Sequence, residues 1–184
     1  MTEGAVTKKR KFPLFWASMA CAVLALAVCC ALPLWQCLVL TNLNNGQIRF
    51  AAPIADEEVF SVSFTHSVNK SDVEEFYQVR EDAIFVTALH YSSFGAGMPQ
   101  DPREEGATSV RWEDGKIIAE GYDLEIERLV FNVARIADII LHYRGQSIHL
   151  DQIDAPGEPL HFQIKRCSLF RMFSFSICRE AKAG

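Results

Sequence analysis

An uncharged apolar run directly follows a basic cluster at the N-terminus. Residues 8–11 read Lys-Lys-Arg-Lys, and residues 12–40 contain no charged side chain. About 20 apolar residues are enough for a helix to span a bilayer, and this run is longer. Basic residues next to a span stay on the cytoplasmic side. The pattern therefore predicts a cytoplasmic N-terminus at residues 1–11, one transmembrane helix at residues 12–40, and an extracytoplasmic remainder.

A cleaved signal peptide is the alternative to a retained span. Signal peptides have an apolar core of about 7–15 residues and a small-residue cleavage site. Here the core is longer, no Ala-x-Ala stands at its end, and Leu32, Leu34 and Trp35 continue it. A lipoprotein signal is disfavoured because Val28 precedes Cys29, where a small residue is expected. We therefore expect an uncleaved single-pass membrane protein.

The charge of the chain limits its partners. The net charge is −5 at pH 7 although the N-terminus is basic, so the region after the apolar run is acidic. An acidic surface repels phosphate backbones, and we expect no nucleic-acid partner. It suits solubility or a basic protein partner.

The rest of the chain divides into one domain with short flanking segments. Residues 41–47 are polar and turn-prone, which predicts a linker that holds the domain close to the membrane. Residues 48–166 are long enough for one domain with its own core. Residues 167–184 form a tail that fits either an extra edge strand or an amphipathic segment.

Alternating apolar and polar side chains predict many short strands. Residues 60–66 alternate with a period of two, and residues 84–90 are almost continuously apolar, as is typical of a central strand. Asp114-Gly115 and Arg144-Gly145 each separate two apolar segments and predict hairpins. Further strands are predicted at residues 160–165 and, in competition with a helix, at residues 124–133. This pattern predicts an all-β fold, a single antiparallel β-sandwich or barrel-like domain.

Two cysteines lie outside the apolar run, Cys167 and Cys178. In an oxidising compartment such a pair is able to form a disulfide. The alternative is two unpaired, partly buried thiols, and the sequence leaves both open.

One polar patch combines a histidine with a carboxylate. His66 and Ser67 end a predicted strand, and the polar turn at residues 69–72 should return the chain antiparallel. This places Glu74 or Glu75 within reach of His66, where a carboxylate would favour the imidazolium. We expect the patch to bind a ligand or partner. The alternative is a purely structural hydrogen bond across a hairpin.

A second patch is the loop at residues 94–99, Phe-Gly-Ala-Gly-Met-Pro, which ends at Pro99. Gly95 and Gly97 permit positive φ angles or a close approach of the backbone to another group. Backbone N–H groups in such a loop are able to form an anion-binding nest. The alternative is a β-bulge or a tight corner.

The two patches together resemble a bacterial family known as domain of unknown function 1850. The resemblance rests on His66-Ser67-Val68 with a glutamate one strand later, and on residues 94–99. It continues weakly to residue 165 and does not cover the tail. Of the two adjacent glutamates, Glu75 fits the motif better.

Members of this family are small exported or membrane-anchored proteins, often encoded beside TRAP-type transporters of the TAXI subclass. The resemblance therefore implies an accessory role near such a transporter, whose membrane or solute-binding subunits are the expected partners. It implies no established activity and no cofactor.

No motif in the sequence requires catalysis. Ser67 and His66 are not spaced as a dyad, because neighbours on a strand point to opposite faces. The sequence contains no Gly-x-Ser-x-Gly elbow, P-loop or dinucleotide fingerprint. His142 and His149 are predicted diagonal neighbours on one face of a hairpin, but a metal site needs further ligands. A metal-dependent or hydrolytic enzyme is therefore only the second alternative.

We expect an extracytoplasmic accessory protein that acts by binding and has no enzymatic activity. A free-standing ligand-binding or sensor domain is the first alternative. The expected contact site comprises His66, Ser67, Glu74, Glu75, Gly95, Gly97 and Pro99.

Overall fold

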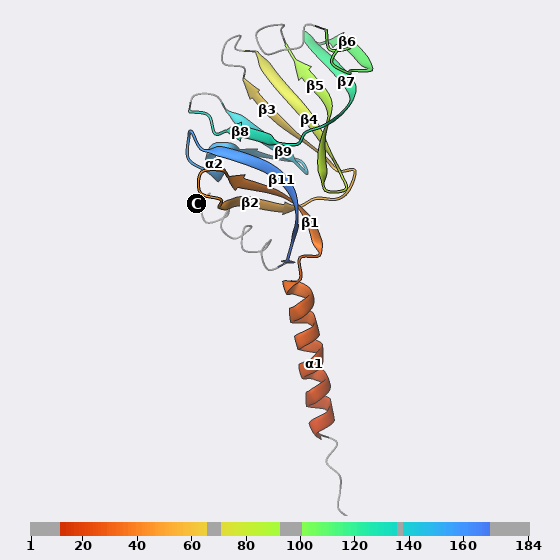
Figure 1. Cartoon of the computed structure of the whole chain (residues 1–184), viewed down its shortest axis with the longest axis vertical. Helices are drawn as coiled ribbons and strands as arrows, with labels where there is room; N and C mark the ends of the chain where they lie inside the picture. Colours follow the sequence, from red (N-terminus) through yellow and green to blue (C-terminus); the bar gives the residue numbers. More distant parts are fainter. Residues whose placement is uncertain (1–11, 66–70, 93–100, 136–137, 170–184) are drawn as a thin grey trace, which may run out of the picture.

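The computed structural model describes residues 12–65, 71–92, 101–135 and 138–169. An N-terminal helix, α1 (Phe12–Ala31), precedes two β-sheets (Figure 1). The smaller sheet consists of β1 (Trp35–Asn42), β2 (Ile48–Pro53), β8 (Leu129–Asn132) and β11 (Pro159–Cys167). The larger sheet consists of β3 (Val59–Thr65), β4 (Asp72–Arg80), β5 (Ala83–Tyr91), β6 (Ser109–Glu113), β7 (Lys116–Glu125), β9 (Ile139–Tyr143) and β10 (Gln146–His149). A short helix, α2 (Leu150–Ile153), connects β10 to the loop before β11.

The two sheets are antiparallel and pack face to face. The four-stranded sheet has the order β2-β1-β11-β8, and the seven-stranded sheet has the order β10-β9-β3-β4-β5-β7-β6. Aromatic rings connect the layers: Phe60 of β3 lies 6.3 Å from Phe162 of β11, centroid to centroid, and stacks on Tyr77 of β4 at 5.2 Å. The predicted all-β antiparallel fold is confirmed.

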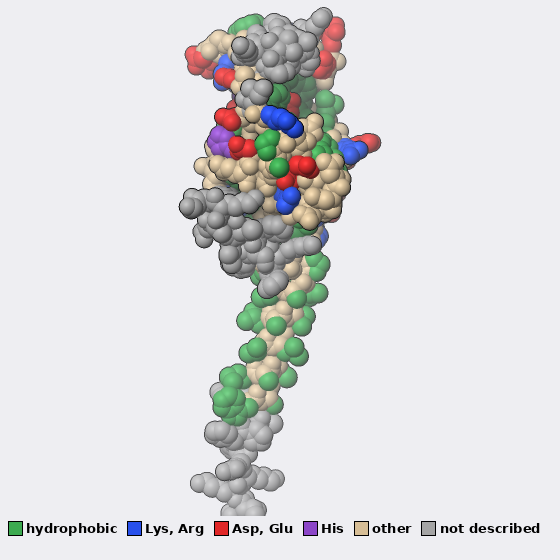
Figure 2. All heavy atoms as spheres, turned by 90° about the vertical axis from the view of Figure 1, so that its left-hand side faces the viewer, with side chains coloured by type: hydrophobic (Ala, Val, Ile, Leu, Met, Phe, Trp, Pro, Cys, Tyr) green, Lys and Arg blue, Asp and Glu red, His purple; other side chains and the backbone are tan. Residues whose placement is uncertain are grey.

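Helix α1 carries apolar side chains around its whole circumference. From Trp16 to Ala31 every side chain is exposed except Cys30, which is half-buried. The helix projects away from the sheets, and Figure 2 shows hydrophobic side chains along its length. Within the part of the chain that the structure describes, no helix has both the length and the apolar character needed to cross a membrane.

The predicted helix over residues 12–40 is wrong in its C-terminal part. The helix ends at Ala31, shortly before Pro33, and β1 begins at Trp35. Pro33 lacks a backbone donor and disfavours helical geometry in the residue before it. Cys37 to Leu40 are completely buried because both faces of this strand are covered. A strand buried on both faces has an unbroken apolar sequence, so periodicity alone does not distinguish it from a buried helix.

The domain therefore starts at Trp35 rather than at residue 48. Of the predicted linker at residues 41–47, Thr41 and Asn42 belong to β1 and the remainder forms the turn before β2. The domain also extends to Cys167, the last residue of β11 and the predicted start of the tail. Cys167 packs against Cys37 of β1 in a small apolar cluster. Cys178 lies outside the described residues, so the predicted Cys167–Cys178 disulfide stays a prediction.

The predicted hairpins are confirmed. β6 and β7 are joined by Asp114 and Gly115, with φ angles of 49° and 76°. β9 and β10 are joined by Arg144 and Gly145, with φ angles of 49° and 73°. Two consecutive positive φ angles match the right-handed twist of the flanking strands. Residues 124–133 form the end of β7 and all of β8, so the strand interpretation is correct.

The larger sheet extends beyond the area that the smaller sheet covers (Figure 1). The main core includes side chains from β1, β3, β9 and β11, but none from β6 or β7. On the uncovered part of the inner face, Tyr91 and Ile117 form one small cluster with Val73. Ala119 and Tyr122 form another with Ala107. This overhang leaves space on the inner face of β4, β5 and β7.

Candidate functional site

Strand β4 places the two candidate glutamates on opposite faces of the larger sheet. Glu74 pairs with Ser63 of β3 and His90 of β5, and its carboxylate accepts a 2.6 Å hydrogen bond from Ser61 Oγ. This is the outer face. Glu75 points to the inner face together with Tyr77, whose hydroxyl donates a hydrogen bond to Glu75 Oε2. The structure thus separates two residues that the sequence left as alternatives.

Glu75 has an environment that disfavours its charge. Burial raises the pKa of the Glu75 carboxyl, and the hydrogen bond from Tyr77 only partly offsets this effect. Burial also raises the pKa of Tyr77 well above its usual value, and the negative charge of Glu75 adds to it. Tyr77 therefore stays protonated and acts as a hydrogen-bond donor.

The Glu75 carboxyl opens into a cavity of about 260 Å³ under the overhang of the larger sheet. We call it the Glu75 cavity. Its walls combine carboxylates, tyrosine rings and aliphatic side chains, namely Glu75, Tyr77, Val86, Leu89, Glu105, Tyr122, Leu124 and Ile126. Few polar groups among apolar walls are typical of small-molecule sites.

A glycine in β7 aims Tyr122 at this cavity. Gly121 has a φ of 77°, and a Cβ atom there would lie 1.8 Å from Thr108 Oγ1, so only glycine fits. Strand β5 pairs with this segment of β7, and the pairing is irregular here. Val86 pairs with Leu124, but Ala88 pairs with Glu120, so the register shifts between them. Such bulges redirect the neighbouring side chain. Tyr122 accordingly lies on the inner face and is only 6% exposed.

The Tyr122 hydroxyl is buried without a hydrogen-bond partner among the described residues. Burial, together with the nearby Tyr91 and Glu105, raises the pKa of Tyr122 to about 12. A buried hydroxyl without a partner is uncommon because its desolvation is not compensated. Tyr122 also lines the Glu75 cavity, so this uncompensated hydroxyl lies beside the cavity.

The other predicted site residues, His66, Ser67, Gly95, Gly97 and Pro99, lie outside the described residues. Their flanking strands are described. Thr65 at the end of β3 pairs with Asp72 at the start of β4, and Val73 pairs with Tyr91 at the end of β5. The end of β3, the start of β4 and the end of β5 therefore lie side by side at one end of these strands. In the chain, residues 66–70 link β3 to β4, and residues 93–100 follow β5, which is the direct neighbour of β4.

The outer face carries a histidine that sequence reasoning did not select. The His90 ring lies 4.5 Å from the Phe76 ring, and His90 Nε2 is 4.0 Å from Glu120 Oε1. Burial lowers the pKa of His90 although the charges of Glu74 and Glu120 oppose the shift. Glu74 therefore belongs to an outer-face cluster and not to the Glu75 cavity.

The two histidines of the β9–β10 hairpin are diagonal neighbours on one face, as predicted, because His142 pairs with Ser147 and His149 with Ile140. Both ring nitrogens of His142 are hydrogen-bonded, to Ser63 Oγ at 2.7 Å and Ser147 Oγ at 3.0 Å. Within the described ranges, no group of three or more His, Cys, Asp or Glu side chains is placed to hold a metal ion.

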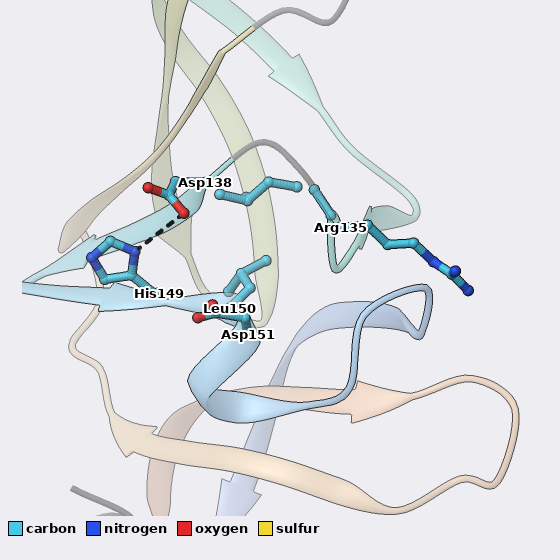
Figure 3. A pocket seen from close by; sticks show the side chains of 7 residues that line it. Arg135, Asp138, His149, Leu150 and Asp151 are labelled. Carbon is cyan, nitrogen blue, oxygen red and sulfur yellow. Dashed lines mark ion pairs between the residues drawn. The ribbon is translucent and has the colours of Figure 1, made fainter.

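A second cavity, of about 60 Å³, lies where β9, β10 and α2 meet. Figure 3 shows His149 and Asp138 facing each other, with Arg135 extending away from them. The His149 Nδ1 to Asp138 Oδ1 distance is 3.9 Å and both side chains are exposed, so this pair contributes little. The space suits a few water molecules rather than a ligand.

Sequence reasoning found Glu75 but missed Tyr77, Glu105 and Tyr122. Tyrosines at alternating strand positions read as ordinary core residues. The available signal was Gly121, since a glycine inside an apolar strand marks a bulge or a close backbone approach. Glu105 lies outside the strands and has no sequence signal that connects it to β4.

The structure is an antiparallel all-β domain with a cavity on the inner face of its larger sheet. Residues 60–150 match the model of the family described as Domain of unknown function (DUF1850). The match runs from β3 into α2 and includes the strands that form the Glu75 cavity. No curated protein and no solved structure matches the chain.

Proposed function

We propose that this chain is a membrane-anchored, extracytoplasmic accessory protein that acts by binding a small ligand in the Glu75 cavity. One observation carries the proposal. A partly buried carboxyl, Glu75, and a buried hydroxyl without a partner, Tyr122, line the same cavity of about 260 Å³. Buried polar groups without full compensation reduce stability, and functional sites are where such a cost is retained.

The chemistry of the cavity favours binding over catalysis. Tyr77 has a pKa far above neutral and already donates to Glu75, so it serves to orient the carboxylate. The apolar walls supply contact area for a ligand, and the carboxyl and hydroxyl groups would fix its orientation. These are the properties of a recognition site.

The anchored location rests on the N-terminal segment. Residues 8–11 are basic, and α1 exposes apolar side chains on all sides where its side chains are described. We propose that this segment holds the domain at the outer face of a bacterial inner membrane, with the N-terminus in the cytoplasm. The resemblance to the family suggests TAXI-type TRAP transporter subunits as neighbours.

The test of ligand binding is native mass spectrometry of the full chain, extracted gently from its own membranes. We expect a small molecule to copurify with the wild type and with Glu74→Gln, and to be lost with Glu75→Gln. Glu74→Gln is the matched control because it makes the same chemical change on the other face of β4. Retention of the molecule by Glu75→Gln would place it elsewhere and refute the proposed site.

The accessory role needs a separate experiment. Crosslinking in native membranes followed by pull-down should recover transporter subunits. If none is recovered and solute uptake is normal after deletion of the gene, the accessory role is wrong. The cavity would then favour the alternative, a free-standing ligand-binding or sensor domain.

A further inference from the structure

We infer that the Glu75 cavity selects a small organic cation, an ammonium group attached to a short apolar chain or a single aromatic ring. The inference rests on the proposed function, since it specifies the ligand of the same cavity. It is carried by the charges, the hydrogen-bonding groups and the size of the cavity.

The charges of the cavity favour a cation. Two carboxylates, Glu75 and Glu105, line it, and its described lining contains no Lys, Arg or His. An organic anion would meet two like charges without a compensating base, at a cost that increases in a partly desolvated site. A cation would instead pair with Glu75.

The hydrogen-bonding groups match the geometry of an ammonium. Tyr77 donates to Glu75 Oε2, so that oxygen is already partly satisfied. The other carboxylate oxygen would accept a hydrogen bond from the ligand. The Tyr122 oxygen is a second acceptor, buried without a partner among the described residues. An ammonium carries three donors and no acceptor, so it is able to donate to a carboxylate oxygen and to a second acceptor.

The walls and the volume determine the rest of the ligand. The aliphatic part of the lining consists of Val86, Leu89, Leu124 and Ile126. The cavity of about 260 Å³ is slightly smaller than the range of about 300–1,000 Å³ for drug-sized ligands. The apolar part of the ligand is therefore short.

The test compares three probes that differ mainly in charge: 2-phenylethylamine, 2-phenylethanol and 3-phenylpropionate. Isothermal titration calorimetry is performed on the full chain in lipid nanodiscs, with empty nanodiscs as the reference for partitioning into lipid. We expect the amine to bind the wild type at least about tenfold more tightly than either other probe, which corresponds to about 1.4 kcal/mol.

Variants connect the binding to the named groups. Glu75→Gln should weaken binding of the amine at least about tenfold, because it removes the charge but keeps the shape. Tyr122→Phe should weaken it about fivefold, as expected for one hydrogen bond. Glu74→Gln should leave it unchanged, since Glu74 is on the outer face.

The outcomes separate the ligand class from the proposed function. If 3-phenylpropionate or 2-phenylethanol binds as tightly as the amine and Glu75→Gln abolishes it, the cavity binds ligands but the cation inference is wrong. If the amine binds equally to the wild type, Glu75→Gln and Tyr122→Phe, the inference is also wrong. If no probe binds and no molecule copurifies with the wild type, the proposed binding function fails as well.

Discussion

Glu74 and Glu75 are adjacent in β4, but their carboxylates lie on opposite faces of the larger sheet. Glu74 accepts a hydrogen bond from Ser61 on the outer face, at 2.6 Å, and Glu75 accepts one from Tyr77 at the cavity. Because the two residues share their chemistry and their strand, they form a matched pair. Glu74→Gln and Glu75→Gln remove the same charge from the same strand. A difference between their effects therefore reflects the surroundings of each side chain.

Glu75→Gln is expected to stabilise the fold at neutral pH. Burial raises the pKa of Glu75 above its usual 4.5, although Tyr77 donates a hydrogen bond to it. Ionising this carboxyl therefore destabilises the folded state as the pH rises from the usual pKa of 4.5 to the raised folded pKa, and the loss is complete above it. An amide avoids that cost and still accepts from Tyr77. We expect a gain of about 0.5–2 kcal/mol at pH 7, measured by denaturant unfolding of the full chain in detergent micelles.

The pH dependence provides the control for this prediction. At about pH 4 most of the Glu75 carboxyl is protonated in both the folded and the unfolded state, so the gain should largely disappear. Glu74→Gln should lack the gain at neutral pH. An equal gain from Glu75→Gln at both pH values would show that burial of the charge is not its cause.

Gly121→Ala is expected to destabilise the larger sheet and disturb the Glu75 cavity. The φ of 77° costs an alanine about 1–2 kcal/mol. The added Cβ would also lie 1.8 Å from Thr108 Oγ1, so the Thr108 side chain must move. We expect a total loss larger than about 2 kcal/mol in denaturant unfolding.

Two further variants divide this loss into its parts. Gly115→Ala has almost the same φ, 76°, with no atom within 4 Å of the added Cβ, so it measures the backbone cost alone. Thr108→Ala combined with Gly121→Ala removes the hydroxyl that the new Cβ would meet. If Gly121→Ala costs no more than Gly115→Ala, the close approach of Thr108 has no energetic importance.

The strands of the larger sheet were predictable because one face of each is buried and the other is partly exposed. Their sequences therefore tend to alternate between apolar and polar side chains. One local signal is the alternation of apolar and polar side chains, as in residues 60–66. The other is a turn sequence that accepts positive φ angles, as in Asp114-Gly115 and Arg144-Gly145. The segment Cys37–Leu40 lacks the first signal because both of its faces are buried. This segment follows an equally apolar helix, α1. Pro33 is therefore the one local sequence signal for the boundary between α1 and β1.

Only the part of the candidate site that depends on neighbouring residues in the sequence could be predicted. Glu75 could be selected from the motif, but its face depends on the register of β4 against β3 and β5. Tyr122 lines the cavity because of the bulge at Gly121, and Glu105 because of the path of the chain before β6. Such long-range placement depends on the packed sheet and not on neighbouring residues.

Asn42 is expected to be important for stability. It is fully buried at the end of β1, and its Nδ2 donates to Asp154 Oδ2 at 2.6 Å and to Glu158 Oε2 at 2.7 Å. Asn42→Ala would leave the buried Asp154 with fewer donors, at a cost of about 1–3 kcal/mol in unfolding free energy. The control is Asn44→Ala, which removes an exposed donor to the same Glu158 and should cost less than about 0.5 kcal/mol. Equal losses would contradict a special role for the buried amide.

The contribution of Asp154 should disappear in acid. Burial raises the pKa of Asp154, but hydrogen bonds from Asn42, the Ala155 N–H and Arg49 outweigh burial and hold the pKa below its usual 3.8. The stabilisation is therefore complete above this value and is lost as the pH falls through the folded pKa. The difference between wild type and Asn42→Ala should shrink as the pH is lowered from about 5 to about 2. A difference that stays constant over this range would exclude the ionised Asp154 as its source.

The Cys37 thiol is expected to be almost unreactive in the folded chain. Cys37 is completely buried in β1, and burial together with the neighbouring Cys167 raises its pKa from 9.0 to about 12. Since only the thiolate reacts with iodoacetamide, this shift alone reduces the reactive fraction about a thousandfold at neutral pH. Labelling followed by peptide mass spectrometry should therefore modify Cys37 only when guanidinium unfolds the domain. Modification at the same rate with and without guanidinium would contradict the burial of β1, and with it the assignment of residues 35–42 to the sheet rather than to the N-terminal helix.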